Sequence, residues 1–218
     1  MSAKNLVVIS AGLSQPSSTR MLGDRLAAAT VEALKTVGAD ETGIDVDGDD
    51  VTVQTFELRD VATDIMNNML TGFPSPKLQK VIDAVTSADG LIAVTPIFTT
   101  SYSGLFKSFF DVIDTEALTG LPVVIGATAG TPRHSLALDY AIRPMFMYLH
   151  ANVVTTAVFA ASEDWGSGAD TVKTLPERIE RAASELAPLV AASTRSSQVR
   201  DPFAIDGSLS PVGGFQPS

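Results

Sequence analysis

The segment Gly90-Leu-Ile-Ala-Val-Thr-Pro-Ile-Phe-Thr-Thr-Ser-Tyr-Ser-Gly-Leu-Phe-Lys107 shows how this chain is built. Its first five residues are apolar, as in a buried strand, and Pro96 then opens a loop that is rich in hydroxyl side chains. An apolar-faced helix is expected at 105–113. In an open parallel sheet, ligands bind at the carboxyl ends of strands, where the loops are not fixed by packing. The segment therefore predicts a strand, a binding loop and a helix in direct succession.

The same succession recurs along the chain. Apolar runs that are typical of buried strands lie at 6–9, 51–58, 90–94, 121–127 and 153–159. Apolar residues at helical spacing alternate with these runs at 18–37, 77–88, 105–113, 136–149 and 175–192. This alternation predicts an α/β fold with a five-stranded parallel sheet and right-handed crossovers. We expect the flavodoxin-like three-layer sandwich, with strand order 2-1-3-4-5.

The length of 218 residues and the hydrophobic content of 45% fit one well-packed domain, expected at 1–192. The remaining residues, 193–218, are rich in Ser, Gly and Pro but include several apolar side chains. They predict either a flexible tail or a strap across a neighbouring subunit. Residues 38–50 read as an exposed acidic connection, and residues 59–76 as a long irregular one.

Composition excludes several kinds of site. The chain has no cysteine and only two histidines, which excludes disulfides, thiolate ligands, a cysteine nucleophile and a histidine-rich metal site. A calcium loop from Asp45 fails because Gly48 is its fourth residue and Phe56 takes the place of the bidentate glutamate. We therefore expect no metal.

The formal net charge is −10, which argues against a surface for nucleic acid or anionic lipid. No stretch approaches the roughly 20 apolar residues that span a bilayer, and the first residues are too short for a signal peptide. The sequence therefore predicts a cytoplasmic protein with no membrane or nucleic-acid partner.

Three loops, at 10–20, 96–103 and 128–134, follow strands that such a fold brings to one edge. Neither the dinucleotide fingerprint G-x-G-x-x-G nor the P-loop motif occurs. The first loop instead offers several serine and threonine hydroxyls and Arg20, directly before a helix. This arrangement favours a terminal phosphate monoester. The alternative is ordinary helix capping by Ser18 or Thr19.

A serine hydrolase is disfavoured by the same loops. There is no G-x-S-x-G elbow, and the sequence offers no identifiable acid partner for His134. We therefore predict no catalytic side chain of this kind.

Two stretches resemble the NADPH-dependent FMN reductase family, especially the reductases of two-component flavin-dependent monooxygenase systems such as sulfonate utilisation. Residues 96–107 carry the family's proline, aliphatic and aromatic positions, then Ser-aromatic-Ser-Gly and a lysine. Residues 128–144 carry its Gly-Thr, His, Leu-Ala-x-Asp-Tyr-Ala and Arg-Pro elements. Together with the first loop, the likeness covers roughly the first 190 residues.

The resemblance implies FMN and NADPH or NADH as ligands, with hydride transfer carried by the flavin rather than by a protein acid or base. It also implies a homodimer or homotetramer that supplies reduced flavin to a partner monooxygenase. Two alternatives remain open on the same fold, namely an FMN-bound quinone or azo reductase and a non-enzymatic electron carrier. No residue decides between NADPH and NADH, although Arg20 and Arg133 are candidates for an adenosine phosphate.

The resemblance also assigns site residues. Those expected at the FMN phosphate are Ser10, Ser14, Ser17, Thr19 and Arg20. Those expected along the flavin ring are Pro96, Ile97, Phe98, Thr99 and Ser101. Those expected around its pyrimidine side are Ala129, Gly130, Thr131 and His134. Tyr140 matches a tyrosine associated with a helix irregularity near the flavin and the tetramer interface, with simple packing as the alternative.

Overall fold

The structure is a computed structural model, and it describes residues 3–37, 51–165 and 174–197. The predicted acidic connection at 38–50 lies outside the described residues. So do residues 198–218, which make up most of the predicted tail.

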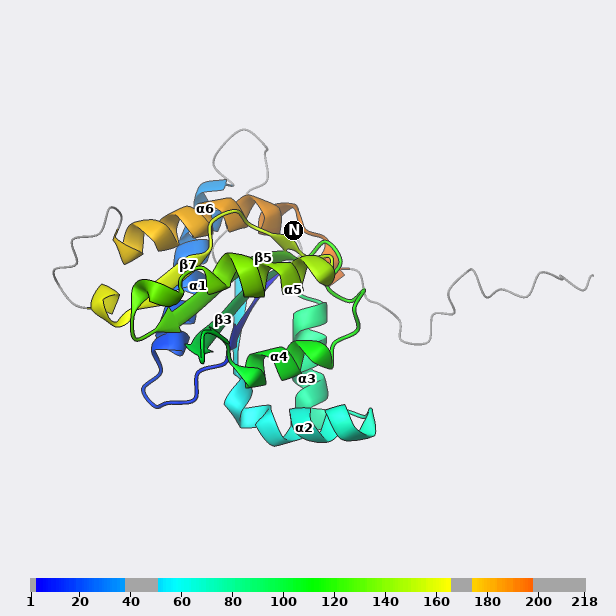
Figure 1. The fold of residues 1–218 in the computed structure, drawn as a ribbon. Helices are drawn as coiled ribbons and strands as arrows, with labels where there is room; N and C mark the ends of the chain where they lie inside the picture. Colours follow the sequence, from blue (N-terminus) through cyan, green and yellow to red (C-terminus); the bar gives the residue numbers. More distant parts are fainter. Residues whose placement is uncertain (1–2, 38–50, 166–173, 198–218) are drawn as a thin grey trace, which may run out of the picture.

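A parallel sheet forms the centre of the molecule (Figure 1). Its strands are β1 (Lys4–Ser10), β2 (Val51–Glu57), β3 (Gly90–Phe98), β5 (Pro122–Ala129), β6 (Asn152–Val153) and β7 (Val158–Ala161). The order is β2-β1-β3-β5, and both β6 and β7 pair with the outer edge of β5. Since β6 and β7 together occupy the place of the fifth predicted strand, the flavodoxin-like order 2-1-3-4-5 is confirmed.

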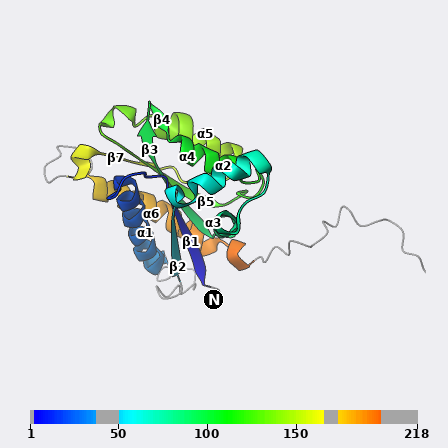
Figure 2. The same cartoon turned by 90° about the horizontal axis from the view of Figure 1, so that it is seen from below.

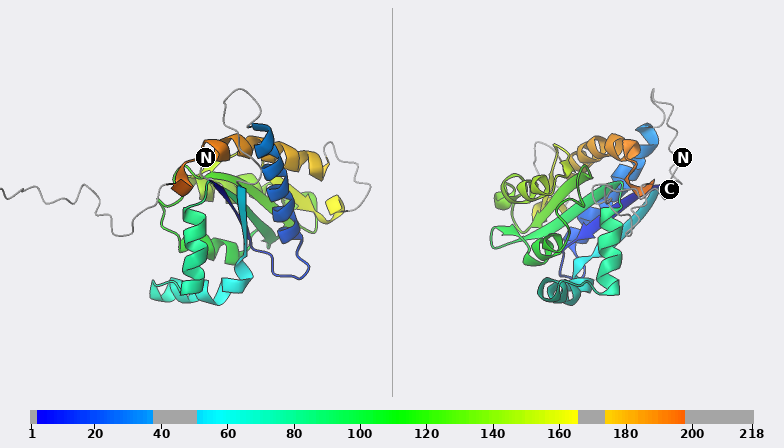
Figure 3. Two further views of the ribbon diagram at one scale, coloured as in Figure 1. Left: turned by 180° about the vertical axis from the view of Figure 1, so that it is seen from behind. Right: turned by 90° about the vertical axis from the view of Figure 1, so that its right-hand side faces the viewer.

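Helices cover both faces of the sheet. One face carries α1 (Ser18–Val37) and α6 (Leu175–Ala192), which pack against each other (Figure 2). The other carries α2 (Ala62–Thr71), α3 (Pro76–Thr86), α4 (Gly104–Asp111) and α5 (Arg143–Tyr148). The side views show these as three layers, with the sheet in the middle (Figure 3). The three-layer sandwich is therefore confirmed.

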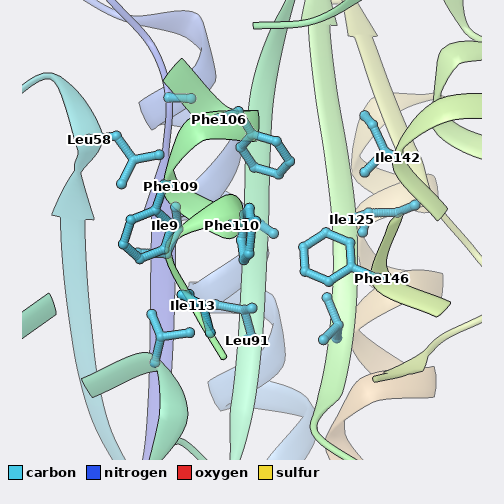
Figure 4. Packing of buried hydrophobic residues seen from close by; sticks show 14 of the residues in the cluster. Ile9, Leu58, Leu91, Phe106, Phe109, Phe110, Ile113, Ile125, Ile142 and Phe146 are labelled. Atoms are coloured by element: carbon cyan, nitrogen blue, oxygen red, sulfur yellow. The ribbon is translucent and has the colours of Figure 1, made fainter. Parts of the chain in front are cut away.

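Alternation along the strands divides the core into two clusters. Leu6 and Val8 of β1 pack with α1 and α6, whereas Val7 and Ile9 face the other layer. In that second cluster, aromatic rings of α4 and α5 form the centre (Figure 4). Phe110 lies 4.9 Å from Phe106 and 4.8 Å from Phe146, measured between ring centroids, and both pairs meet edge to face.

The prediction of an irregular connection at 59–76 is wrong. A 3-10 turn, η2 (Leu58–Val61), leads into α2 and then α3. Ile65 is the apolar residue of α2 that is fully buried, while Met66, Met69 and Leu70 of the same helix are exposed. Because so little of its apolar surface faces the core, the helical pattern of this segment is weak in the sequence.

The predicted helix at 136–149 is interrupted. Its first part is a π-helical segment, η4 (Leu138–Ile142), and α5 begins only at Arg143. Pro144 has no N–H to donate to the carbonyl of Tyr140, four residues earlier, which favours a wider turn there. The irregularity expected at Tyr140 is therefore confirmed, and its side chain is 80% exposed rather than packed in the core.

The fifth predicted strand is divided because side chains bind its backbone. The guanidinium of Arg143 donates to the carbonyls of Val154 at 2.8 Å and Thr155 at 2.9 Å. The carboxylate of Glu185 accepts from the N–H of Thr156 at 2.7 Å and from its hydroxyl at 2.6 Å. These groups satisfy the backbone between β6 and β7 in place of a neighbouring strand.

Candidate functional site

A pocket of about 340 Å³ lies at the carboxyl ends of the central strands. The three loops that were expected to meet there do so, and a fourth loop, after β7, completes the wall. The lining residues are Gly12, Leu13, Ser14, Ser18, Thr19, Pro96, Ile97, Phe98, Thr128, Ala129, Gly130, Ser162 and Trp165. This is the edge at which the fold class places ligands.

The first loop brings the start of α1 to the pocket. Ser17 precedes the helix, and its hydroxyl accepts the N–H of Arg20 at 3.2 Å, so Ser17 rather than Ser18 or Thr19 acts as the cap. A Cβ added at Gly12 would stand 2.0 Å from Ser17 Oγ, so only glycine fits beside the cap. Ser18 and Thr19, the first residues of α1, line the pocket. The pocket therefore lies at the N-terminus of this helix, where the helix dipole and the free N–H groups favour a bound anion.

The start of α1 and the third loop are joined by a hydrogen bond between two residues that line the pocket. The hydroxyls of Thr19 and Thr128 are hydrogen-bonded at 2.8 Å, and both residues are buried. A satisfied buried pair of this kind fixes the relative positions of the two loops.

The second loop is a tight hairpin. Strand β3 runs on to Phe98, turns through two residues and returns as the antiparallel β4 (Ser101–Tyr102). The two turn residues, Thr99 and Thr100, have φ values of 46° and 72°, which are strained for β-branched side chains. The turn holds Phe98 at the pocket, where its side chain is 47% exposed.

Arg20 is held by carboxylates. Its Nε donates to Asp24 at 2.8 Å, and its Nη1 donates to Glu57 at 3.1 Å. The hydrogen bond to Asp24, which outweighs the effect of partial burial, raises the pKa of Arg20 above its ordinary value. Glu57 also pairs with Arg59, so the charges of the four side chains balance.

The fourteen residues assigned from sequence divide into two groups. Those that line the pocket are Ser14, Thr19, Pro96, Ile97, Phe98, Ala129 and Gly130. Those that do not are Ser10, Ser17, Arg20, Thr99, Ser101, Thr131 and His134. Ser10 is fully buried at the end of β1, while Thr131 directly precedes η3 (Pro132–His134), of which His134 is the last residue.

The residue most clearly missed from sequence is Trp165, which lines the pocket from η5 (Ser162–Trp165). The turn is fixed by Asp164, which accepts the N–H of Ala161 at 2.7 Å and pairs with Arg178. The guanidinium of Arg25 lies 4.8 Å from the centroid of the Trp165 ring. Because this loop also follows a strand, it could have been expected at the same edge, but the strand order does not show that Trp165 lines the pocket.

The lining determines what the pocket can do. None of the described residues that line it has an ionisable side chain, so binding relies on hydroxyls, backbone groups and apolar contact. No group of three or more His, Asp or Glu residues suited to a metal ion occurs in the described parts of the chain. Among the described helices, none is long and apolar enough to cross a membrane.

Comparison with known proteins gives a consistent result. The family model described as NADPH-dependent FMN reductase matches residues 5–166. An FMN reductase (NADPH) of Pseudomonas aeruginosa is 33% identical over 184 residues, which cover 84% of this chain and 91% of that protein. The NADH-dependent FMN reductase SfnE of Pseudomonas putida is 30% identical, with 86% and 93% covered.

Solved structures agree. An oxidoreductase from Corynebacterium diphtheriae superposes with a TM-score of 0.79 at 45% identity, covering 89% of this chain and 100% of that one. An archaeal flavodoxin, at 14% identity and a TM-score of 0.52, shares the fold alone. The match to the family model and the identity to the Pseudomonas relatives show that this chain belongs to the NADPH-dependent FMN reductase family.

Proposed function

We propose that this protein is an NAD(P)H-dependent FMN reductase that transfers hydride from a reduced nicotinamide to FMN. The observation that carries the proposal is the polarity of the pocket. The first loop and the start of α1 contribute the hydroxyls of Ser14, Ser18 and Thr19 to the lining, whereas the second loop contributes the apolar segment 96–98. FMN has the same division, because its phosphate monoester and its flat ring lie at opposite ends of the molecule.

Different residues of the pocket would contact the phosphate, the ring and the pyrimidine edge of FMN. Ser14, Ser18 and Thr19, with the N-terminus of α1, would hold the phosphate through hydroxyls and N–H groups. The apolar segment 96–98 would contact the ring, and the backbone at Ala129 and Gly130 would meet its pyrimidine edge. The remaining residues assigned from sequence would support these contacts from beneath or beside the pocket.

When bound, flavin supplies the atom that accepts hydride. The protein's own contribution is geometric, since the strained hairpin and the linked threonines fix the pocket walls before any ligand arrives. Phe98 and Trp165 would add apolar surface for contact with the flat ring of a bound flavin.

The reduced flavin would pass to a flavin-dependent monooxygenase, as the likeness to two-component reductases implies. We place the reaction in the cytoplasm, where reduced nicotinamide nucleotides are available. Phe98, which lines the pocket, is partly exposed to solvent, and this is compatible with flavin leaving after reduction.

We also propose one catalytic domain, residues 1–192, that assembles as a homodimer or homotetramer. Large apolar side chains are exposed along the π-helical segment, α5 and the residues just before them, namely Leu136 (64%), Tyr140 (80%), Met147 (62%) and Tyr148 (73%). Several exposed large apolar side chains within a short stretch favour a contact surface. A second copy of the chain is the partner that the family resemblance implies.

The proposal is tested by following NADPH and NADH at 340 nm with and without added FMN, after extensive dialysis. We expect consumption that requires added FMN. A protein that stays yellow through dialysis and reduces quinones far faster than FMN would instead be a quinone reductase. No consumption under any condition would remove the enzyme proposal and favour an electron carrier.

A further inference from the structure

Most arginines in the described part of the chain are already bound within the protein. Those paired with carboxylates are Arg20, Arg59, Arg143, Arg178 and Arg181. Arg195 donates to backbone carbonyls, including those of Thr119 and Ala117. Two arginines, Arg25 and Arg133, form neither an ion pair nor a hydrogen bond with the described residues.

Arg25 has a defined place beside the pocket. It extends from the second turn of α1, and its guanidinium lies 4.8 Å from the centre of the Trp165 ring. Trp165 itself lines the pocket, together with Ser14 and Ser18 of the first loop. Figure 2 shows the yellow turn that ends in Trp165 next to the dark blue start of α1. The cation–π contact therefore holds a free positive charge at the rim of the site.

A phosphate group bound at this side of the pocket would lack a positive charge from the other residues at the start of α1. At the start of α1, the positive charges of Arg20 and Arg59 are balanced by Asp24 and Glu57. A phosphate monoester would bring between one and two further negative charges into a protein whose net charge is already −10. On this side of the pocket, among the described residues, Arg25 is the cation that no acid neutralises.

We propose that Arg25, held over the ring of Trp165, binds a phosphate monoester of the nucleotide substrates at the rim of the pocket. The inference rests on the proposed function, because it assumes that flavin and nicotinamide nucleotides meet there. Two such groups are available, the 5′-phosphate of FMN and the 2′-phosphate of NADPH. Guanidinium and phosphate form charge-assisted hydrogen bonds, for which Arg is better suited than Lys.

Three variants test this assignment. Arg25→Met removes the charge but keeps a long side chain against Trp165. Arg25→Lys keeps a positive charge but lacks the planar guanidinium group that can bind a phosphate with two hydrogen bonds. Lys35→Met removes a charge from the same helix about 15 Å further along its axis and serves as the matched control. Circular dichroism verifies that each variant is folded.

Two pairs of ligands separate the sources of phosphate. Dissociation constants are measured for FMN and for riboflavin, which lacks the phosphate, and KM values for NADPH and for NADH. Two ratios are compared with wild type, the Kd of FMN over that of riboflavin and the KM of NADPH over that of NADH. We expect Arg25→Met to raise one of these ratios about 10-fold and Arg25→Lys to raise it less. Lys35→Met should change neither ratio. A change in the flavin ratio would assign Arg25 to the 5′-phosphate of FMN, and a change in the nicotinamide ratio would assign it to the 2′-phosphate of NADPH.

The inference is overturned if Arg25→Met leaves both ratios at their wild-type values, or if Lys35→Met changes them equally. That result would leave the reductase function intact, provided that the wild-type protein still consumes NAD(P)H with FMN. Conversely, a wild-type protein without this activity would contradict the proposed function, while the comparison of FMN with riboflavin would still test Arg25.

Discussion

Trp165 is the only tryptophan in the chain, and it lines the pocket. Its fluorescence therefore reports on that site alone. We expect FMN to quench most of this emission with a single saturating curve, because a flavin within the pocket would lie close to the indole. The measurement is a titration at fixed protein concentration, with Trp165→Phe as the silent control. Flavin-dependent activity without any change in emission would place the flavin elsewhere.

Single residues also show where sequence reasoning reached its limit. The hydroxyls of the first loop were visible in the sequence, yet only the folded loop shows that Ser17 caps the helix while Ser18 lines the pocket. Arg20 looked available for a phosphate, but Asp24 and Glu57 already hold it. Glu57 is 37 residues away in the chain, so no local pattern reveals this pairing.

Among the described residues, the β3–β4 hairpin carries two adjacent non-glycine residues at positive φ. Its turn places Thr99 and Thr100 at positive φ, where Asn-Gly is the favoured pair. The double variant Thr99→Asn, Thr100→Gly should raise the free energy of unfolding by about 2 kcal/mol, measured by urea denaturation without ligand. Thr52→Gly in the extended β2 is the control and should lower it by about 0.5–1 kcal/mol. A less stable double variant would show that the turn is not strained.

The interrupted fifth strand depends on Glu185. Partial burial alone would raise the pKa of this carboxyl, but hydrogen bonds from Thr156 and Arg181 outweigh burial and lower the pKa. A lowered pKa in the folded state means that ionised Glu185 stabilises the protein above the ordinary pKa of a glutamate. This contribution is lost as pH falls through the folded-state value.

Glu185→Gln should therefore lower the free energy of unfolding by about 1–2 kcal/mol at neutral pH. The difference from wild type should shrink once the pH falls below the pKa of Glu185 in the folded protein. Urea denaturation at several pH values measures both effects, and Glu180→Gln, on an exposed position of the same helix, is the control. A difference that stays constant across this pH range would contradict the role given to the ionised carboxylate.

Elements were predictable where burial produces a clear periodicity. Helices α1 and α6 end within a residue or two of their predicted bounds, since each buries one continuous face. Helix α2 was missed because most of its apolar residues are exposed. The break in the fifth strand was missed because Arg143 and Glu185, which cause it, come from other elements.

At the scale of the whole molecule, the exposed face around α5 predicts self-association. The double variant Met147→Glu, Tyr148→Glu would place charges in the proposed contact surface, where an unpaired charge is costly to bury. We expect light scattering after size exclusion to give a dimer or tetramer for wild type and a smaller species for the variant. Leu70→Glu, on the exposed side of α2, is the control and should leave the mass unchanged. A wild-type monomer would refute the assembly.

The fold as a whole was the most predictable level, because alternating strands and helices leave few arrangements with right-handed crossovers. The strand order then brings the loop ends to one edge without any further information. What the order cannot supply is the set of side chains that point inward from each loop. The contribution of Trp165 from the loop after β7 is the clearest case.

The central claim is that the pocket bounded by these loops is where FMN is reduced. A Cβ added at Gly130 meets no atom within 4 Å, so the backbone there has room for Gly130→Ala. Because Gly130 lines the pocket, we expect the indole of Gly130→Trp to occupy space that a ligand would need. The most direct measurement is FMN-dependent NADPH oxidation at 340 nm for these variants and wild type. We predict similar rates for wild type and Gly130→Ala, and a rate at least about 10-fold lower for Gly130→Trp. A Gly130→Trp protein that is folded and as active as wild type would contradict the claim.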